Sequence, residues 1–82
     1  MERPAIERLI IEILKKYTKI KSVWETADQD TEIISGLKIN SARFIDLVME
    51  IEDVFKVDIE INLMDRIITI KDAVDAVSEK LN

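Results

Sequence analysis

The sequence predicts an all-α fold, a small four-helix bundle with three longer helices, a short third helix and a long first loop. Apolar residues recur at helical spacing in three separate stretches, whereas only one short stretch alternates as a strand would. The 82 residues include one glycine and one proline, so tight turns are few. The length and the 48% apolar content suit a single domain, residues 1–82, with one core.

The first helix is predicted over residues 4–18. Pro4 suits the first helical position, because the N–H that it lacks would have no helical acceptor there. Ile11 lies off the apolar stripe, so we expect it to be partly exposed. The stripe follows the spacing i, i+3, i+4, i+7, i+8 and i+11 and consists of Ile6, Leu9, Ile10, Ile13, Leu14 and Tyr17.

Residues 18–40 lack helical periodicity and are predicted to form a long connection. A structureless loop of this length is uncommon in a small domain, so its apolar side chains should hold it against the bundle. Acidic residues at positions 28, 30 and 32 resemble the start of a calcium loop, but such a loop needs glycine at its sixth position, where Ile33 stands. We therefore predict no metal site. The expected anchors are Val23, Trp24, Ile33, Ile34 and Leu37.

The second helix is predicted to begin at Ser41 and to run to about residue 56. The Ser41 hydroxyl is a suitable N-cap, because it can accept a hydrogen bond from an amide of the next turn. Between Ser41 and Phe55, one cation, Arg43, and four carboxylates give a net charge of −3. The expected apolar stripe consists of Ile45, Leu47, Val48, Ile51, Val54 and Phe55.

The remaining residues predict a short helix and a long one. Val57, Ile59 and Ile61 alternate as in a strand, but a lone strand has no partner, so we expect an extended loop whose isoleucines reach the core. Asn62 is the expected cap of a short helix that includes Leu63, Met64, Arg66 and Ile67. The last helix is predicted over residues 70–81, because the segment 69–72, Thr-Ile-Lys-Asp, resembles a capping box. Its expected buried face is Ile70, Ala73, Val74, Val77 and Leu81.

The composition excludes several kinds of chemistry. Without cysteine or histidine the chain has no disulfides, no thiolate nucleophile, no imidazole catalysis and few options for zinc or haem. The sequence shows no nucleophile–base pair and no glycine-rich phosphate loop, so we predict neither an enzyme nor catalytic residues. No apolar run approaches the roughly 20 residues of a membrane span, and a cytoplasmic monomer is expected.

The charge is unevenly distributed along the chain. Residues 1–21 hold six basic and three acidic side chains and so carry a local charge of +3. Because the net charge of the chain is −5, residues 22–82 carry −8. An acidic majority repels phosphate backbones, so a basic protein surface is expected as a partner rather than nucleic acid. The basic first helix leaves open a membrane-surface role, although lysines on the polar face of a helix usually serve solubility.

Three short stretches match a family pattern, and their spacing fits without a gap. Residues 36–42, Gly-Leu-Lys-Ile-Asn-Ser-Ala, are similar to Asp-Leu-Gly-x-Asp-Ser-Leu. Residues 51–55, Ile-Glu-Asp-Val-Phe, are similar to Leu-Glu-Glu-x-Phe, and Thr69-Ile70 is similar to the Thr-Val that opens the last helix. From about Ile6 to Leu81 the chain thus resembles the acyl carrier protein family.

The resemblance implies that a separate phosphopantetheinyl transferase attaches 4′-phosphopantetheine to Ser41, which Asn40 flanks. The thiol of this cofactor would hold an acyl or aminoacyl group as a thioester, and the protein would present it to charging and transferring enzymes of lipid, polyketide or peptide biosynthesis. A phosphodiester also suits a helix N-terminus, where free N–H groups and the positive end of the helix dipole meet it. The acidic helix would dock onto basic partner surfaces through Arg43, Phe44, Asp46, Met49, Glu50, Glu52 and Asp53.

The residues around this serine depart from the family pattern at several positions. Asn40 replaces Asp, Lys38 replaces Gly and Ala42 replaces Leu, while Arg43 adds a cation. Because modifying transferases commonly approach through basic surfaces, Lys38 and Arg43 indicate a specialised carrier with a dedicated transferase.

Other interpretations of the same residues stay open. The chain can instead be a helical interaction module that lacks a prosthetic group and binds a basic partner through residues 43–53. Ser41 can be a plain cap, and Phe44 and Met49 can be core residues. An ordinary dry core is the default for so small a protein. The alternative is a cavity that shelters the cargo, lined by Ile45, Leu47, Val48, Ile51, Phe55, Ile59, Ile67 and Val74.

Overall fold

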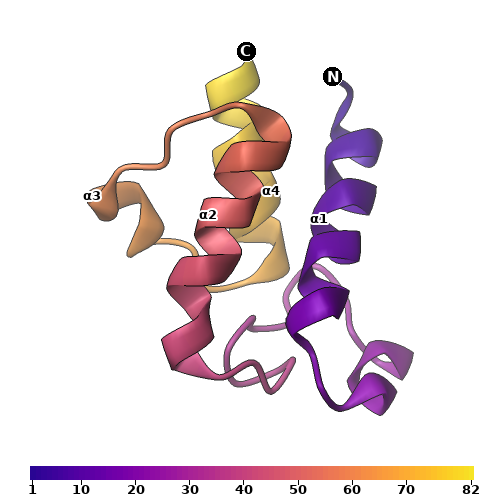
Figure 1. Ribbon diagram of the computed structural model, residues 1–82. Coiled ribbons are helices and arrows are strands. Elements are labelled where there is room, and N and C mark those ends of the chain that lie inside the picture. Colours follow the sequence, from indigo (N-terminus) through magenta and orange to yellow (C-terminus); the bar gives the residue numbers. More distant parts are fainter.

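Three longer helices and a short one form the predicted all-α architecture in the computed structural model, which describes residues 1–82 (Figure 1). The longer helices are α1 (Arg3–Tyr17), α2 (Phe44–Phe55) and α4 (Ile70–Leu81), and the short one is α3 (Ile61–Met64). Two 3₁₀ segments, η1 (Lys21–Glu25) and η2 (Ser41–Arg43), lie in the connection before α2.

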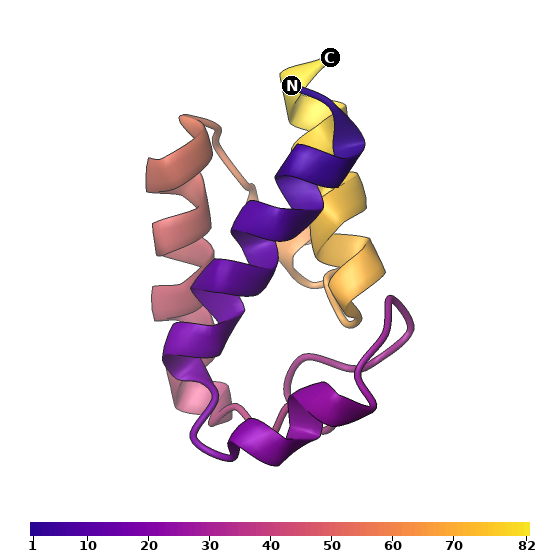
Figure 2. The ribbon, with the colours of Figure 1, turned by 90° about the vertical axis from the view of Figure 1, so that its right-hand side faces the viewer.

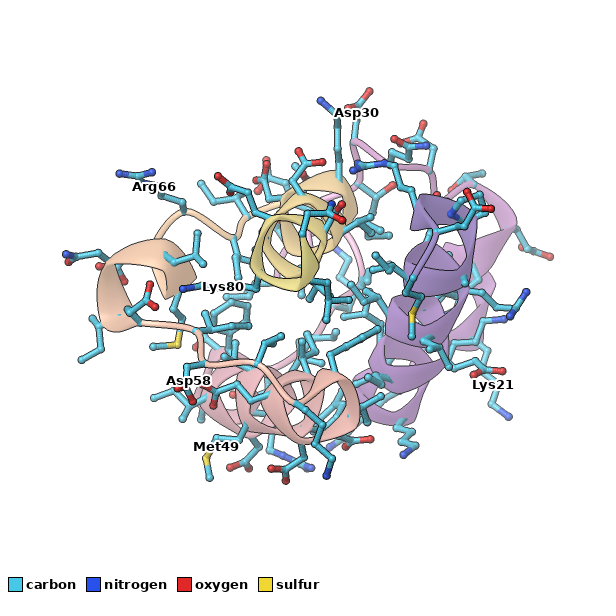
Figure 3. All side chains as sticks on the ribbon, turned by 90° about the horizontal axis from the view of Figure 1, so that it is seen from above. Lys21, Asp30, Met49, Asp58, Arg66 and Lys80 are labelled. Carbon is cyan, nitrogen blue, oxygen red and sulfur yellow. The ribbon has the colours of Figure 1, made fainter.

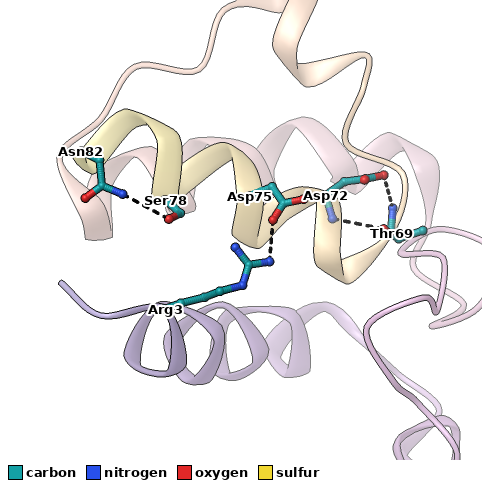
Figure 4. A network of polar contacts seen from close by, with 6 residues as sticks. All are labelled: Arg3, Thr69, Asp72, Asp75, Ser78 and Asn82. Atoms are coloured by element: carbon teal, nitrogen blue, oxygen red, sulfur yellow. Dashed lines mark hydrogen bonds and ion pairs between the residues drawn. The ribbon is translucent and has the colours of Figure 1, made fainter.

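Helix α1 runs antiparallel to both α2 and α4 and packs against both, while α3 lies to one side (Figure 1). Both chain ends lie at the same end of the bundle (Figures 1 and 2), and the Arg3 guanidinium pairs with Asp75 at 2.5 Å (Figure 4). The start of α2 lies at the opposite end. This arrangement keeps residues 41–44 away from both termini.

The core fills the space between the three longer helices. Removing these apolar side chains from water is the main favourable contribution to folding. The long connection also contributes buried side chains, and this explains how so long a loop stays on the bundle. The buried apolar residues are Ile6, Ile10, Ile13, Leu14, Ile33, Leu37, Ile39, Leu47, Val48, Ile51, Phe55, Ile59, Ile67, Ile70, Ala73, Val74, Ala76 and Val77.

The ends of α1 and α4 follow local rules. Pro4 lies in the first turn of α1, and at the other end the buried Thr18 hydroxyl donates to the Leu14 carbonyl at 2.8 Å. The predicted capping box of α4 is confirmed: the Thr69 hydroxyl accepts from the Asp72 amide at 3.1 Å, and the Asp72 carboxylate accepts from the Thr69 amide at 3.0 Å (Figure 4). Both helices therefore lie within one residue of their predicted bounds.

The long connection is tied to the entrance of α4. The Ile33 amide donates to the Ile68 carbonyl at 2.8 Å, and the Ile70 amide donates to the Thr31 carbonyl at 3.0 Å. Trp24 is half-buried, with the Lys15 ammonium 5.5 Å from its ring centroid. No group of three or more metal-ligating side chains gathers in this loop or elsewhere. The loop is thus a packed layer over one end of the bundle.

Four apolar side chains that we expected in the core are exposed. The α2 stripe is narrower than predicted, because only positions 47, 48, 51 and 55 face α1 and α4. Ile61 is the first residue of α3 and is exposed, so of the two isoleucines in that segment only Ile59 is buried in the core, while Val57 is partly buried against it. The exposed fractions are 41% for Ile34, 58% for Ile45, 45% for Val54 and 71% for Ile61.

The prediction that Asn62 caps the short helix is also wrong. Helix α3 begins two residues earlier than predicted, at Ile61, with Glu60 as its cap residue and no capping side chain. The Met64 amide donates to the Glu60 carbonyl at 2.8 Å, so one backbone turn defines the whole helix. Ile67 lies beyond α3 and is buried in the core.

Candidate functional site: the serine at the head of α2

Ser41 begins η2, which continues directly into α2. The prediction that its hydroxyl caps the helix is wrong, because the residue before it does so: Asn40 Oδ1 accepts from the Ala42 amide at 2.7 Å. Ser41 is exposed, and its hydroxyl has no hydrogen-bond partner within the chain. The side chain is therefore free for modification at the head of a continuous run of helical turns.

The backbone before Ser41 is held by its neighbours on both sides. Leu37 and Ile39 are buried, and the Ile39 amide donates to the Ile34 carbonyl at 3.1 Å. Lys38 lies between them with φ 58°, a left-handed conformation that costs little for glycine but disfavours a side chain. The turn over residues 33–38 therefore ends at Lys38, and Ser41, three residues further on, is exposed.

Glu50 faces α1 rather than solvent. Its carboxylate accepts from the Tyr17 hydroxyl at 2.9 Å and pairs with the Lys16 ammonium at 2.5 Å. The hydrogen bond from Lys16 holds the pKa of Glu50 below its ordinary value, and burial together with Glu50 raises the pKa of Tyr17. These contacts link residues more than thirty positions apart, so sequence periodicity does not reveal them.

Arg43 joins the same contact between α1 and α2. Its guanidinium lies 4.9 Å from the Tyr17 ring centroid and 3.3 Å from the Asp46 carboxylate, in an exposed i,i+3 pair. A cation over an aromatic face and an exposed ion pair are each modest contributions to stability. Together with Glu50 they connect the end of η2 and the middle of α2 to the last turn of α1.

The other predicted docking residues differ in their surroundings. Glu52 is half-buried and accepts from the Ile59 amide at 2.7 Å, so its carboxylate supports the loop that leads to α3. Asp53 is exposed and has no partner within the chain. Met49 is 55% exposed and points away from the core (Figure 3), whereas Phe44 is half-buried against it.

A shallow groove lies beside the start of α2, on the side of α3. Phe44, Met64, Ile67 and Ile68 supply most of its apolar lining, and Asp65 lies among its polar residues. Seven of the eight side chains suggested as a cavity lining are packed in the core instead. The eighth, Ile45, projects outward and cannot line an internal cavity.

Comparison with known proteins identifies the class of this domain. A family model described as "Phosphopantetheine attachment site" matches residues 8–77, and the chain belongs to this family. Such domains are carriers that hold 4′-phosphopantetheine covalently on a serine. No curated protein matches the chain at a significant level. None of the helices is long and apolar enough to cross a membrane.

Proposed function

We propose that this protein is an acyl or aminoacyl carrier and that Ser41 is the residue that holds 4′-phosphopantetheine. The observation that carries the proposal is the exposed, unbonded hydroxyl of Ser41 at the head of α2, within the region that the family model matches. Ser35 donates to Glu32 at 2.9 Å and Ser78 accepts from the Asn82 amide nitrogen at 3.4 Å, so neither offers the same setting.

The residues around Ser41 fit a phosphodiester. The helix dipole places partial positive charge at the head of these helical turns, where the amides of Ala42 and Arg43 already donate to Asn40 at 2.7 Å and 2.9 Å. Lys38, which forms no ion pair within the chain, adds a nearby cation that the family pattern lacks. When bound, the cofactor supplies a thiol that holds the cargo as a thioester.

The chain's own side chains position the cofactor and meet partners, and they catalyse nothing. The contacts of Tyr17 with Arg43 and Glu50 fix the first turns of α2, and the buried Leu37 and Ile39 fix the turn before Ser41. The protein then acts as a cytoplasmic monomer that transferase and acyl-handling enzymes approach from the Ser41 end. Lys38 and Arg43 favour a dedicated transferase, because they repel a basic approach surface.

The second candidate is an interaction module that keeps the fold without a prosthetic group. The acidic character of α2 favours this alternative, since Asp46 and Asp53 are exposed in the chain without any group on Ser41. The two functions differ in one property, the covalent change at Ser41.

The test is an intact mass measurement after incubation with coenzyme A and a panel of phosphopantetheinyl transferases. We expect a mass gain of one phosphopantetheinyl group, loss of that gain in Ser41→Ala, and full modification of the control Ser35→Ala. A chain that no transferase modifies, and that is also unmodified when isolated from its source, rules out the carrier function. Modification of Ser41→Ala would rule out the site.

A further inference from the structure

We propose that residues 19–21, Lys-Ile-Lys, form a second docking surface, and that the transferase that modifies Ser41 meets it with an acidic patch. These three residues, which follow the end of α1, are called the basic corner. The inference rests on the proposed carrier function and names the chemistry of one partner. It differs from docking through the acidic helix α2 in both its position and the sign of its charge.

The basic corner lies in a part of the chain without carboxylates. Between Glu12 and Glu25 the sequence has four lysines and no acidic residue. The last two of these, Lys19 and Lys21, are exposed and belong to none of the ion pairs of the chain. Lys21 points away from the core (Figure 3). The corner therefore presents two free cations on a chain whose net charge is −5.

Local stability does not account for these cations. The last turn of α1 already holds two other lysines, and Lys19 lies beyond the cap residue of that helix, Thr18. Lys21 is the first residue of η1, and a cation at the start of a helix opposes its dipole. Ile20, between the two lysines, is 51% exposed. An exposed apolar side chain between two unpaired charges suits an interface in which the apolar group is covered and the charges meet a partner.

The basic corner lies at the same end of the bundle as Ser41 (Figures 1 and 2). One contact joins the two segments: the guanidinium of Arg43, two residues after Ser41, lies 4.9 Å from the ring centroid of Tyr17, two residues before Lys19. An interface of the usual size buries about 800 Å² of each partner. An enzyme seated on Ser41 therefore also covers neighbouring segments at this end of the bundle.

The expected occupant is an acidic protein surface rather than an anionic membrane. A helix that lies in a membrane interface inserts a broad apolar face, whereas Ile20 is the one apolar residue of the corner and most of the α1 stripe is buried in the core. Residues 22–82 carry −8, so an extended anionic surface would repel the rest of the domain. A protein can confine its carboxylates to the area of the corner.

The experiment measures kcat/KM for modification of the full chain by the transferase of the panel that modifies it fastest, with intact mass as the readout. The test variant reverses both charges, Lys19→Glu with Lys21→Glu. Its matched control, Arg8→Glu with Arg66→Glu, changes the net charge equally at two exposed and unpaired cations. Arg8 lies about two turns before the end of α1, and Arg66 lies on the opposite side of the molecule from Lys21 (Figure 3). Urea unfolding of each variant checks that the fold is retained.

At about 50 mM NaCl we expect the test variant to lower kcat/KM by about tenfold or more and the control to lower it by less than about threefold, because only the corner meets carboxylates of the transferase. At about 500 mM NaCl the difference between the wild type and the test variant should fall below about threefold, since salt screens these charges. An unchanged kcat/KM in the stable test variant would overturn the inference. An increase would show that the transferase approaches with a basic surface.

Ile20 supplies a test that does not depend on charge. Ile20→Ala should lower kcat/KM by about threefold at both salt concentrations, because salt does not screen an apolar contact. Modification of Ile20→Ala at the wild-type rate would remove Ile20 from the docking surface.

A binding measurement tests the membrane as the alternative occupant. The wild type and the test variant are sedimented with vesicles of phosphatidylcholine and phosphatidylserine, and we expect neither to bind. Binding of the wild type alone, with kcat/KM equal in the two proteins, would assign the corner to a lipid surface instead. Complete modification of Ser41 at long times supports the carrier function whatever these rates are, whereas its absence with every transferase removes both proposals.

Discussion

Tyr17 and Glu50 join the last turn of α1 to the middle of α2, through a hydrogen bond of 2.9 Å from the Tyr17 hydroxyl to Glu50 Oε1. Lys16 pairs with the same carboxylate at 2.5 Å, and the Tyr17 ring lies beneath Arg43. Glu50 therefore stabilises the contact between two helices.

Replacing the tyrosine tests this contact. Tyr17→Phe removes the hydroxyl but keeps the ring beneath Arg43, so the free energy of unfolding should fall by about 1 kcal/mol. Urea unfolding measures the change. In a Glu50→Ala background, Tyr17→Phe should lower the free energy of unfolding clearly less. An equal decrease in both backgrounds would show that the hydrogen bond does not contribute to stability.

Gly36 is the one glycine of the chain, and it is needed for a close approach of two backbone segments. A Cβ at this position would lie 2.5 Å from the Glu32 carbonyl oxygen and 2.7 Å from Thr31 Cγ2. Gly36→Ala should therefore lower the free energy of unfolding by about 2 kcal/mol. Asp30→Ala, an exposed change in the same loop, is the control and should stay within about 0.5 kcal/mol of the wild type.

The capping box of α4 predicts a loss of stability when the threonine is truncated. Thr69→Ala leaves the Asp72 amide without its acceptor and should lower the free energy of unfolding by about 1 kcal/mol. Thr26→Ala is the matched control, since Thr26 is exposed and its hydroxyl makes no hydrogen bond. Equal midpoints of thermal unfolding for the two variants would contradict the cap's contribution.

Asp72 makes stability depend on acid pH. The hydrogen bond from the Thr69 amide, more than any other contact, holds the pKa of Asp72 below its ordinary value of 3.8. A carboxyl whose folded pKa is lowered stabilises the protein above its unfolded pKa, and this contribution is lost as pH falls through the folded pKa. Below about pH 4 the wild type should therefore lose stability more steeply than Asp72→Asn. Urea unfolding at a series of pH values between about 7 and 2 makes the comparison, and parallel curves would contradict it.

The sequence sufficed for the helices whose signals are local. The residues of the α1 stripe, from Ile6 to Tyr17, lie within a few helical turns of one another, and the two partners of the Thr69–Asp72 capping box are three positions apart. Periodicity and cap chemistry therefore determine both helices. At the site, Asn40 and Ser41 are adjacent residues with equally good capping side chains. Sequence alone cannot assign the cap between them, because a shift of one residue leaves the apolar pattern of α2 unchanged.

The surface of α2 was less predictable, because its contacts come from distant parts of the chain. The carboxylate of Glu50 bonds Tyr17 and Lys16, which precede it in the sequence by 33 and 34 positions. The carboxylate of Glu52 accepts from the amide of Ile59, in the loop after α2. Ile45 fits the general apolar pattern of the helix, yet no element covers it. The packing of α1 and α3 determines which carboxylates are free and which apolar residue is exposed. Helical periodicity does not specify that packing.

The Arg3–Asp75 pair and the neighbouring chain ends have a practical consequence for experiments (Figures 2 and 4). Both termini lie at the end of the bundle remote from the start of α2. A sensor surface or fused domain joined through either terminus would leave Ser41 and Ile45 facing the solution. Immobilised protein can thus be modified and probed with enzymes in the orientation that the proposed function requires.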